Sequence, residues 1–414
     1  MVPPLALVSS LGAQQDAAES ALAVARAGRL DSALALLAQA RTSDPAYSDL
    51  QLAEARVMSW AGKRREAISR FDSLLAANPA NADAMVGLGY VHHWEGRERA
   101  ARRQADAALK LDSTNTDALE LRNAIRVGAS GSVTASANWS NDSDRNTGFW
   151  QTLSLIAPLA DGLRFLGSAG LLEASDPLRD ATRVGGEAGL GWTLGRFDLA
   201  ALAGARRLDP DAGASRTATT YRGSVSWRPD PAFGIGAGYA RYPYDEIAAL
   251  FERDIDIESL EGGFDAHPTA RLLIAGGAGV LWLSDGNRRT EGRATITQEI
   301  GRHLSLGANG RALGYRQAGV GYFSPDRFHL LEATAAVHAG NARWDGRLSG
   351  GLGGQQIGRG GDTQAEWHVE GRVGRNWGDG NRIEGFGGVT NSAVSSTTGA
   401  FRYRTAGVLL KLAL

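Results

Sequence analysis

Beyond residue 130 the sequence alternates between apolar and ionic residues with a period of two, and this pattern limits the possible folds more than any other feature. The segment "QAEWHVEGRVG" at 364–374 places tryptophan and valine on one face and glutamate, histidine and arginine on the other. Successive side chains of a β-strand point to opposite faces. Such segments therefore predict strands with one apolar face and one ionic face.

Following this alternation along the second half gives 16 strands, several of them ten or more residues long. A tilted strand needs roughly 9 to 11 residues to cross a bilayer, whereas a typical globular strand has about five or six. We expect strands at 132–140, 148–157, 162–173, 183–193, 196–206, 218–228, 232–242, 254–264, 270–283, 289–299, 303–315, 327–339, 342–353, 364–376, 382–390 and 401–414.

The predicted connections alternate between short ones such as "GR" at 195–196 and longer ones such as "LEASDPLRDAT" and "RRLDPDAGASRTA". Outer-membrane barrels have tight turns at one rim and long polar loops at the other. The alternation favours an even strand number and places both ends of the strand region at the short-turn rim. A soluble β-propeller would show a blade repeat of about 40 to 50 residues, and no such repeat is visible.

In a lipid-spanning barrel the apolar face points outward, because a charge in hydrocarbon is costly. The ionic face then lines the lumen, where charges of mixed sign suit neutral or weakly charged hydrophilic cargo. The alternative is that neighbouring strands pair these charges to stabilise a narrow or closed barrel. The candidate lumen-lining residues are Arg289, Glu291, Arg293, Arg343, Asp345, Arg347, Glu366, Glu370 and Arg372.

Aromatic residues near the predicted strand ends fit the two interfacial girdles of such a barrel. These are Trp139, Phe149, Trp192, Phe197, Trp227, Phe233, Tyr239, Trp282, Trp344 and Trp377. One long connection, "YPYDEIAALFERD", is instead apolar at its centre. We expect residues 245–252 to fold inward as a plug, the alternative being a short helix packed on the rim.

Glu366, His368 and Glu370 share one predicted strand face and could hold a cation. Residues two apart on a strand lie roughly 6.6 Å apart, which is too wide for easy chelation. The histidines of the second half are otherwise scattered, and no GxSxG elbow occurs. The sequence therefore predicts no metal site, no cofactor and no enzyme.

The first half has few glycines, and three of them, Gly28, Gly62 and Gly96, are spaced 34 residues apart. Alanines recur in the same register, and "SWAGKRREAISRF" matches "HWEGRERAARRQA", which places Trp60 opposite Trp94. We expect both tryptophans to pack in the core. A period of 34 built from two helices resembles the tetratricopeptide family, with three repeats and a capping helix over 14–127. The resemblance implies a stacked α-solenoid that binds a partner.

Residues 1–13 carry a short apolar run and small residues suited to a signal-peptidase site, and we expect a signal-peptide remnant there. The alternative is a frayed apolar arm. The net charge is −1 and only three lysines occur, so no basic stripe suggests nucleic acid. The absence of cysteine excludes disulfides and thiolate metal sites.

The chain ends on "AGVLLKLAL", in which Val408, Leu410, Leu412 and Leu414 keep the period of two to the last residue. In an outer-membrane barrel these four side chains would face lipid. They are the candidate assembly signal of the closing strand, and Lys411 would point inward.

The order of signal, helical repeats and barrel resembles the outer-membrane exporters of poly-N-acetylglucosamine and cellulose. It is similar to the YaiO-type proteins, whose repeats contain stretches like "ARVMSWAGKRREA" and "PANADAMVGLGYVHHWEGR". The resemblance implies an outer-membrane conduit exporting an exopolysaccharide or another hydrophilic solute, with periplasmic repeats that recruit a protein partner. The alternative is a non-conducting outer-membrane anchor for a periplasmic complex.

Overall fold

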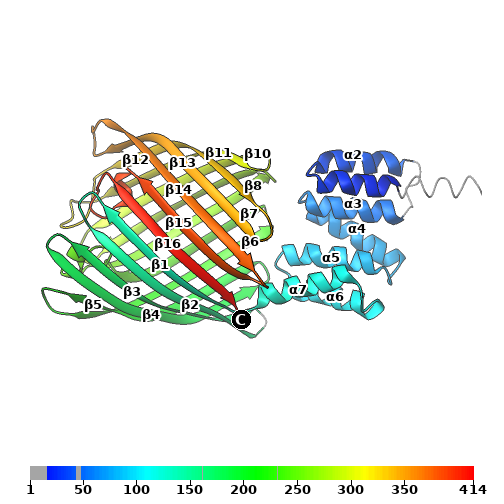
Figure 1. Cartoon of the computed structure of the whole chain (residues 1–414), viewed down its shortest axis with the longest axis horizontal. Helices are drawn as coiled ribbons and strands as arrows, with labels where there is room; N and C mark the ends of the chain where they lie inside the picture. The colour runs from blue at the N-terminus through cyan, green and yellow to red at the C-terminus, as the bar shows by residue number, and fades with distance from the viewer. Residues whose placement is uncertain (1–15, 43–47, 161, 231) are drawn as a thin grey trace, which may run out of the picture. The chain divides into compact units, whose positions relative to one another are not determined.

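The computed structural model describes residues 16–42, 48–160, 162–230 and 232–414 (Figure 1). The predicted signal-peptide remnant at 1–13 and the first residues of the predicted repeat domain lie outside the described residues. The chain divides into two compact units, Met1–Ala129 and Ser130–Leu414. No helix among the described residues is long and apolar enough to span a membrane.

The first unit is helical, and helices adjacent in the sequence pack against each other. Residues 16–26 are helical, followed by α2 (Leu30–Arg41), α3 (Ser48–Trp60), α4 (Arg64–Ala77), α5 (Ala82–Trp94), α6 (Glu98–Leu111) and α7 (Thr116–Ala129). Gly28, Gly62 and Gly96 have φ values of 81°, 76° and 69° in the turns between helices. This left-handed conformation favours glycine, which explains their regular spacing.

The core of the first unit lies where the helices approach most closely. Ala33, Ala67 and Ala101 have no exposed surface, because each sits where a larger side chain would separate two helices. The prediction for the two tryptophans was wrong: Trp60 is 37% exposed and Trp94 is 40% exposed. The space between helices is taken by alanines and a few larger residues, so the indoles remain at the surface.

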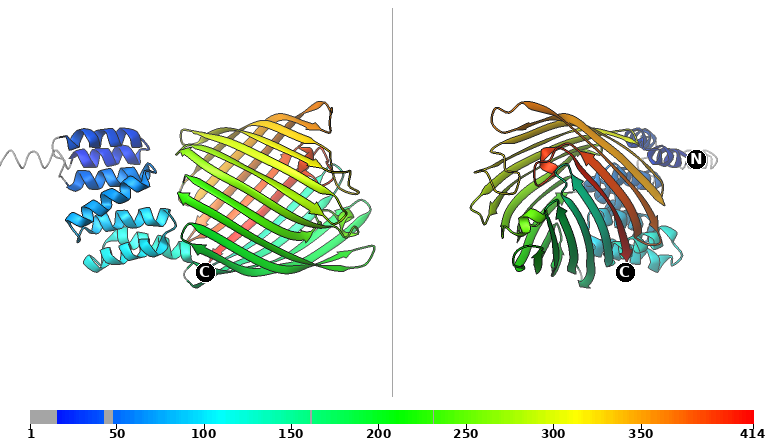
Figure 2. Two further views of the ribbon diagram at one scale, coloured as in Figure 1. Left: turned by 180° about the vertical axis from the view of Figure 1, so that it is seen from behind. Right: turned by 60° about the vertical axis from the view of Figure 1, so that its left-hand side comes forward.

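The second unit is a closed antiparallel barrel whose 16 strands run in sequence order within the described residues (Figures 1 and 2). Every strand pairs with its neighbours in the chain, and β1 pairs with β16 to close the barrel. The strands are β1 (Ser132–Asp142), β2 (Thr147–Ala160), β3 (Leu163–Asp176), β4 (Arg179–Leu194), β5 (Phe197–Pro210), β6 (Arg216–Asp230), β7 (Phe233–Pro243), β8 (Asp256–Thr269), β9 (Leu272–Leu283), β10 (Arg288–Ile300), β11 (Leu304–Tyr315), β12 (Phe328–Gly340), β13 (Trp344–Ile357), β14 (Thr363–Trp377), β15 (Asn381–Thr390) and β16 (Tyr403–Ala413). The predicted strand count and barrel are therefore confirmed.

The connections differ from the prediction at the long-loop rim. Two predicted loops, 172–182 and 206–218, are mostly strand. In the first, β3 continues to Asp176 and β4 begins at Arg179, and in the second, β5 continues to Pro210 and β6 begins at Arg216. Backbone hydrogen bonds between neighbours hold a strand without requiring an apolar face. Within the described residues, three long connections remain at this rim, 244–255, 316–327 and 391–402, and we call them the plug loops.

The barrel interior and its plug as the candidate functional site

The outer face of the barrel is apolar. Large exposed side chains alternate along each strand, for example Leu331 at 69%, Leu352 at 73% and Val373 at 58% exposed. All ten aromatic residues predicted to form girdles lie on this same face by strand alternation, and Phe197 stacks on Trp227 with ring centroids 6.4 Å apart. The inner face carries the ionic residues, as the alternation predicts.

Eight of the nine candidate lumen-lining residues lie on the inner face by alternation, and Arg343 lies in the turn before β13. Part of the set is paired: Glu291 contacts Arg289 at 3.3 Å and Arg311 at 3.4 Å. Asp345 contacts Arg382 at 2.6 Å. Glu370 and Arg372 on β14 differ from these residues, because neither forms an ion pair within the described residues.

Other inward charges form ion pairs between strands that have one strand between them. Arg164 on β3 contacts Asp198 on β5 at 2.6 Å, and Glu187 on β4 contacts Arg222 on β6 at 3.0 Å. Such partly exposed pairs contribute about 0 to 1 kcal/mol each. Their regular occurrence across the wall fits the alternative in which inward charges also stabilise the barrel.

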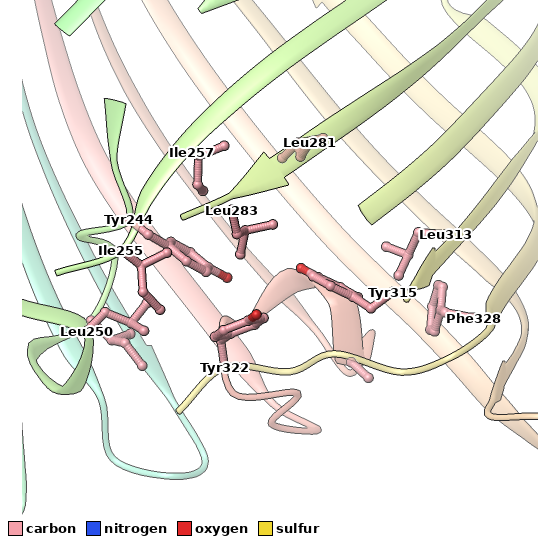
Figure 3. Packing of buried hydrophobic residues seen from close by; sticks show 12 residues of the cluster. Tyr244, Leu250, Ile255, Ile257, Leu281, Leu283, Leu313, Tyr315, Tyr322 and Phe328 are labelled. Carbon is pink, nitrogen blue, oxygen red and sulfur yellow. The ribbon is translucent and has the colours of Figure 1, made fainter. Parts of the chain in front are cut away.

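The first plug loop folds into the barrel, as predicted for residues 245–252. Its short helix α8 (Ala248–Phe251) places Phe251 against Leu172 and Leu208 of the wall. Leu250 belongs to a buried apolar cluster that extends through Tyr322 to Phe328 on β12 (Figure 3). Leu250 and Phe251 are 0% and 1% exposed. Leu172 and Leu208 face the lumen by strand alternation, so the short helix lies inside the barrel and not on its rim.

Three tyrosines join the first plug loop to the second. The ring centroids of Tyr244 and Tyr322 lie 5.4 Å apart, and those of Tyr315 and Tyr322 lie 5.7 Å apart (Figure 3). Tyr322 donates a hydrogen bond to Asp285 Oδ2 at 2.7 Å. Burial raises the pKa of the Tyr244 hydroxyl far above its ordinary value, so this phenol stays neutral at physiological pH.

The third plug loop, which contains the 3₁₀ turn η1 (Ala393–Ser395), completes the plug. Thr397 Oγ1 donates to Glu246 Oε2 of the first plug loop at 2.6 Å. The backbone N–H of Phe323 donates to the Thr397 carbonyl at 2.7 Å. Hydrogen bonds and a continuous apolar cluster therefore join all three plug loops at one end of the barrel interior.

A cavity of about 700 Å³ lies along the inner wall from β2 to β10, on the short-turn side of the plug. Its lining is rich in glycine and serine, and its charged side chains are Arg222, Glu261 and Arg293. Small residues leave space that bulkier ones would fill. The barrel is thus filled by apolar side chains at the loop end and keeps a cavity with three charged side chains below.

One cluster among the described residues brings three possible metal ligands together: Glu332, Glu366 and His368. Sequence reasoning compared Glu366 and His368 with Glu370 on the same strand and missed Glu332 on β12. Only the strand register could have indicated it, because Glu332 and Glu366 both face Gly353 of the strand between them.

No protein-family profile and no curated protein matches the chain. A solved "bacterial polysaccharide outer membrane secretin" is 14% identical, covers 69% of this chain and 99% of its own, and superposes with a TM-score of 0.58. CdiB from Acinetobacter baumannii is 10% identical over 68% of this chain and 60% of its own, with a TM-score of 0.45. The first TPR domain of human RPAP3 is 20% identical over 27% of this chain and 90% of its own, with a TM-score of 0.25. The chain therefore shares the barrel fold of the polysaccharide outer-membrane secretin.

Proposed function

We propose that the second unit is an outer-membrane barrel and that its interior is a gated conduit for a hydrophilic solute. The outward belt of exposed leucine, valine and aromatic side chains carries the membrane assignment. A soluble protein rarely exposes a contiguous apolar surface of this extent. In a lipid bilayer the apolar outer face would contact hydrocarbon, while the ionic inner face would contact water in the lumen.

The topology supports placing the repeats in the periplasm. Ser132 at the start of β1 lies opposite Ala413 at the end of β16, so the chain enters and leaves the barrel at the short-turn rim. Barrels of this class keep short turns on the periplasmic side. The helical unit, which precedes β1, would then offer its surface to a periplasmic protein partner.

The conduit proposal rests on the contrast between the cavity, which contains charged side chains, and the apolar plug. Arg222, Glu261 and Arg293 give the cavity both signs of charge, which suits an uncharged hydrophilic cargo. Passage requires the plug loops to move aside. Export of an exopolysaccharide is the most specific form of the proposal, supported by the shared fold of the polysaccharide secretin and by the YaiO-type resemblance. It includes no catalytic step, in keeping with the prediction that the chain is not an enzyme.

Single-channel conductance of the full-length protein in planar bilayers tests the conduit. We expect small or rare openings in the wild type and frequent, larger openings after deletion of residues 245–252. The control is Leu178→Ser, in a turn at the same rim, where the side chain is 84% exposed and outside the plug. Heat-modifiable migration in SDS gels confirms that each variant forms a barrel.

The second candidate is a non-conducting anchor for a periplasmic complex, favoured by the inward ion pairs that join different strands of the wall. It predicts a folded barrel that never conducts, with or without residues 245–252. That result would remove the conduit and leave the membrane assignment intact.

A further inference from the structure

Glu332, Glu366 and His368 meet on the inner wall beside the plug. Glu332 lies on β12 and the other two lie on β14, with β13 between them. One ligand atom from each residue lies within 4.8 Å of the other two. This spacing allows a single ion to contact all three side chains after small rotamer shifts.

The strand between them, β13, has only glycines on its inner face at this point. Gly353 is the register partner of both Glu332 and Glu366, and Gly351 is the partner of His368. A Cβ atom at Gly351 would lie 2.4 Å from His368 Cε1 and 2.6 Å from Glu332 Oε2. The glycines of β13 therefore leave the space in which side chains from β12 and β14 come together.

Each carboxylate has a polar neighbour at one oxygen and keeps the other for the centre of the cluster. Asn309 Nδ2 donates to Glu332 Oε1 at 2.9 Å. The Thr390 hydroxyl lies 3.4 Å from Glu366 Oε1 and 3.1 Å from the Trp367 carbonyl, the two acceptors for its one proton. Glu332 Oε2 lies 2.9 Å from His368 Nδ1. Glu366 is 2% exposed, and within the described residues its Oε2 has no hydrogen-bond partner. Outer partners that orient ligands in this way are typical of metal sites.

The His368 imidazole, which is charged only when protonated, pairs with Glu332 and leaves at least one negative charge in the cluster when both carboxylates are ionised. Glu332 and Glu366 are 7% and 2% exposed, and within the described residues no arginine or lysine forms an ion pair with either. Two adjacent buried carboxylates are costly without a cation. A divalent ion would offset both charges and contact the unpartnered oxygen of Glu366.

We propose that Glu332, Glu366 and His368 bind one divalent transition-metal ion, with Zn²⁺ preferred, and that this ion fastens the barrel wall to the third plug loop. One imidazole with two carboxylates suits Zn²⁺, whereas Ca²⁺ and Mg²⁺ prefer oxygen ligands alone. Three protein ligands leave a fourth position for water.

The link to the plug runs through the end of β15. Thr390, whose hydroxyl lies beside Glu366, also accepts a hydrogen bond from the Ser392 backbone N–H at 3.0 Å. Gln355 on β13 donates to the Asn391 carbonyl and accepts from the Ala393 N–H. Fixing Glu366 therefore fixes the first residues of the loop that covers the barrel.

The test uses the full-length protein in detergent, freed of metal by a chelator and titrated with ZnCl₂ against a competing indicator. We expect one Zn²⁺ per chain, with affinity at least about tenfold weaker in Glu366→Gln and in His368→Gln. Gly351→Ala should also weaken binding, because its Cβ would occupy the space beside His368 and Glu332. Gly346→Ala on the same strand is the matched control, because its Cβ would meet nothing closer than 3.7 Å. Bound Co²⁺ should show visible d–d absorption in the wild type and in Gly346→Ala.

Hydrogen exchange of residues 391–402 with and without Zn²⁺ tests the link to the plug, and heat-modifiable migration confirms folding. Greater protection in Zn²⁺, lost in Glu366→Gln, supports the proposal. Equal Zn²⁺ affinity in the wild type and all three site variants, or tighter binding of Ca²⁺ or Mg²⁺, overturns the site. Site-specific binding without added protection of 391–402 overturns the fastening role.

Discussion

The carboxylate of Asp245 in the first plug loop lies 3.2 Å from Arg183 Nη1 on the wall strand β4. Arg206 on β5 contacts the same carboxylate at 3.3 Å. The Asp245 side chain is only 5% exposed, so one buried anion ties the plug to two strands. Breaking a buried pair on one side leaves an uncompensated charge, which is more costly than losing a surface pair.

Asp245→Asn should therefore loosen the plug without removing its apolar contacts. Losing the charge leaves Arg183 without its ion-pair partner and Arg206 with only Glu187, 3.9 Å away, at a cost of about 1 to 3 kcal/mol. We expect more frequent channel openings and faster proteolysis of residues 244–255. Asp209→Asn is the matched control, since Asp209 pairs with Arg207 at the same rim but outside the plug. Unchanged gating in Asp245→Asn would show that apolar packing alone holds the plug.

The two faces of β13 should respond oppositely to the same new charge. Leu352 is 73% exposed on the outer face, so Leu352→Arg should destabilise the barrel in lipid by about 2 to 4 kcal/mol. Ser349 points inward opposite Glu370, and Ser349→Arg should be tolerated. Urea unfolding in lipid vesicles measures both. Equal tolerance of the two variants would contradict a lipid-facing outer wall.

The strands could be predicted from the sequence because each one carries its own two-residue alternation. The cluster of Glu332, Glu366 and His368 could not be predicted, since Glu332 and Glu366 meet only through the register of three strands. The plug was partly visible: the apolar centre of the first loop indicated it, whereas Tyr322 and Thr397 take part through contacts between loops that no local pattern encodes.

In the helical unit, the 34-residue register predicted the backbone better than it predicted which side chains are buried. It located Gly28, Gly62 and Gly96 in left-handed turns. It also placed Trp60 and Trp94 at one repeat position, where both are similarly exposed, at 37% and 40%. The shared position thus indicated common surroundings, but it did not indicate whether those surroundings lie in the core or at the surface.

The helical unit should lose stability in mild acid through His92. Burial, and then the nearby Arg97, lower the pKa of the His92 imidazole, while Glu95 opposes them. The unfolded histidine has a pKa of about 6.5, so the unfolded state binds the proton more readily. The stability that neutral His92 contributes is therefore fully present above about pH 6.5. It is lost as the pH drops towards the lower pKa of the folded state.

We expect the thermal midpoint of the helical circular-dichroism signal in the full-length protein to fall between pH 7 and pH 5. His92→Gln should make that fall smaller while keeping a similar side-chain volume. An identical pH dependence in the wild type and His92→Gln would rule out His92 as the cause.

A large apolar side chain at position 414 should permit barrel assembly, whereas a charged one should impair it. Leu414 is 65% exposed, and its backbone N–H donates to the Gly131 carbonyl at 2.9 Å. Its side chain extends the outward series of Val408, Leu410 and Leu412, so a carboxylate there would face lipid headgroups and tails. Leu414→Phe should assemble normally, whereas Leu414→Asp should reduce the heat-modifiable barrel in outer-membrane fractions. The inward Lys411→Asp is the matched control, because it changes charge on the same strand without altering the apolar series. Normal assembly of Leu414→Asp would exclude the terminal residue from the assembly signal.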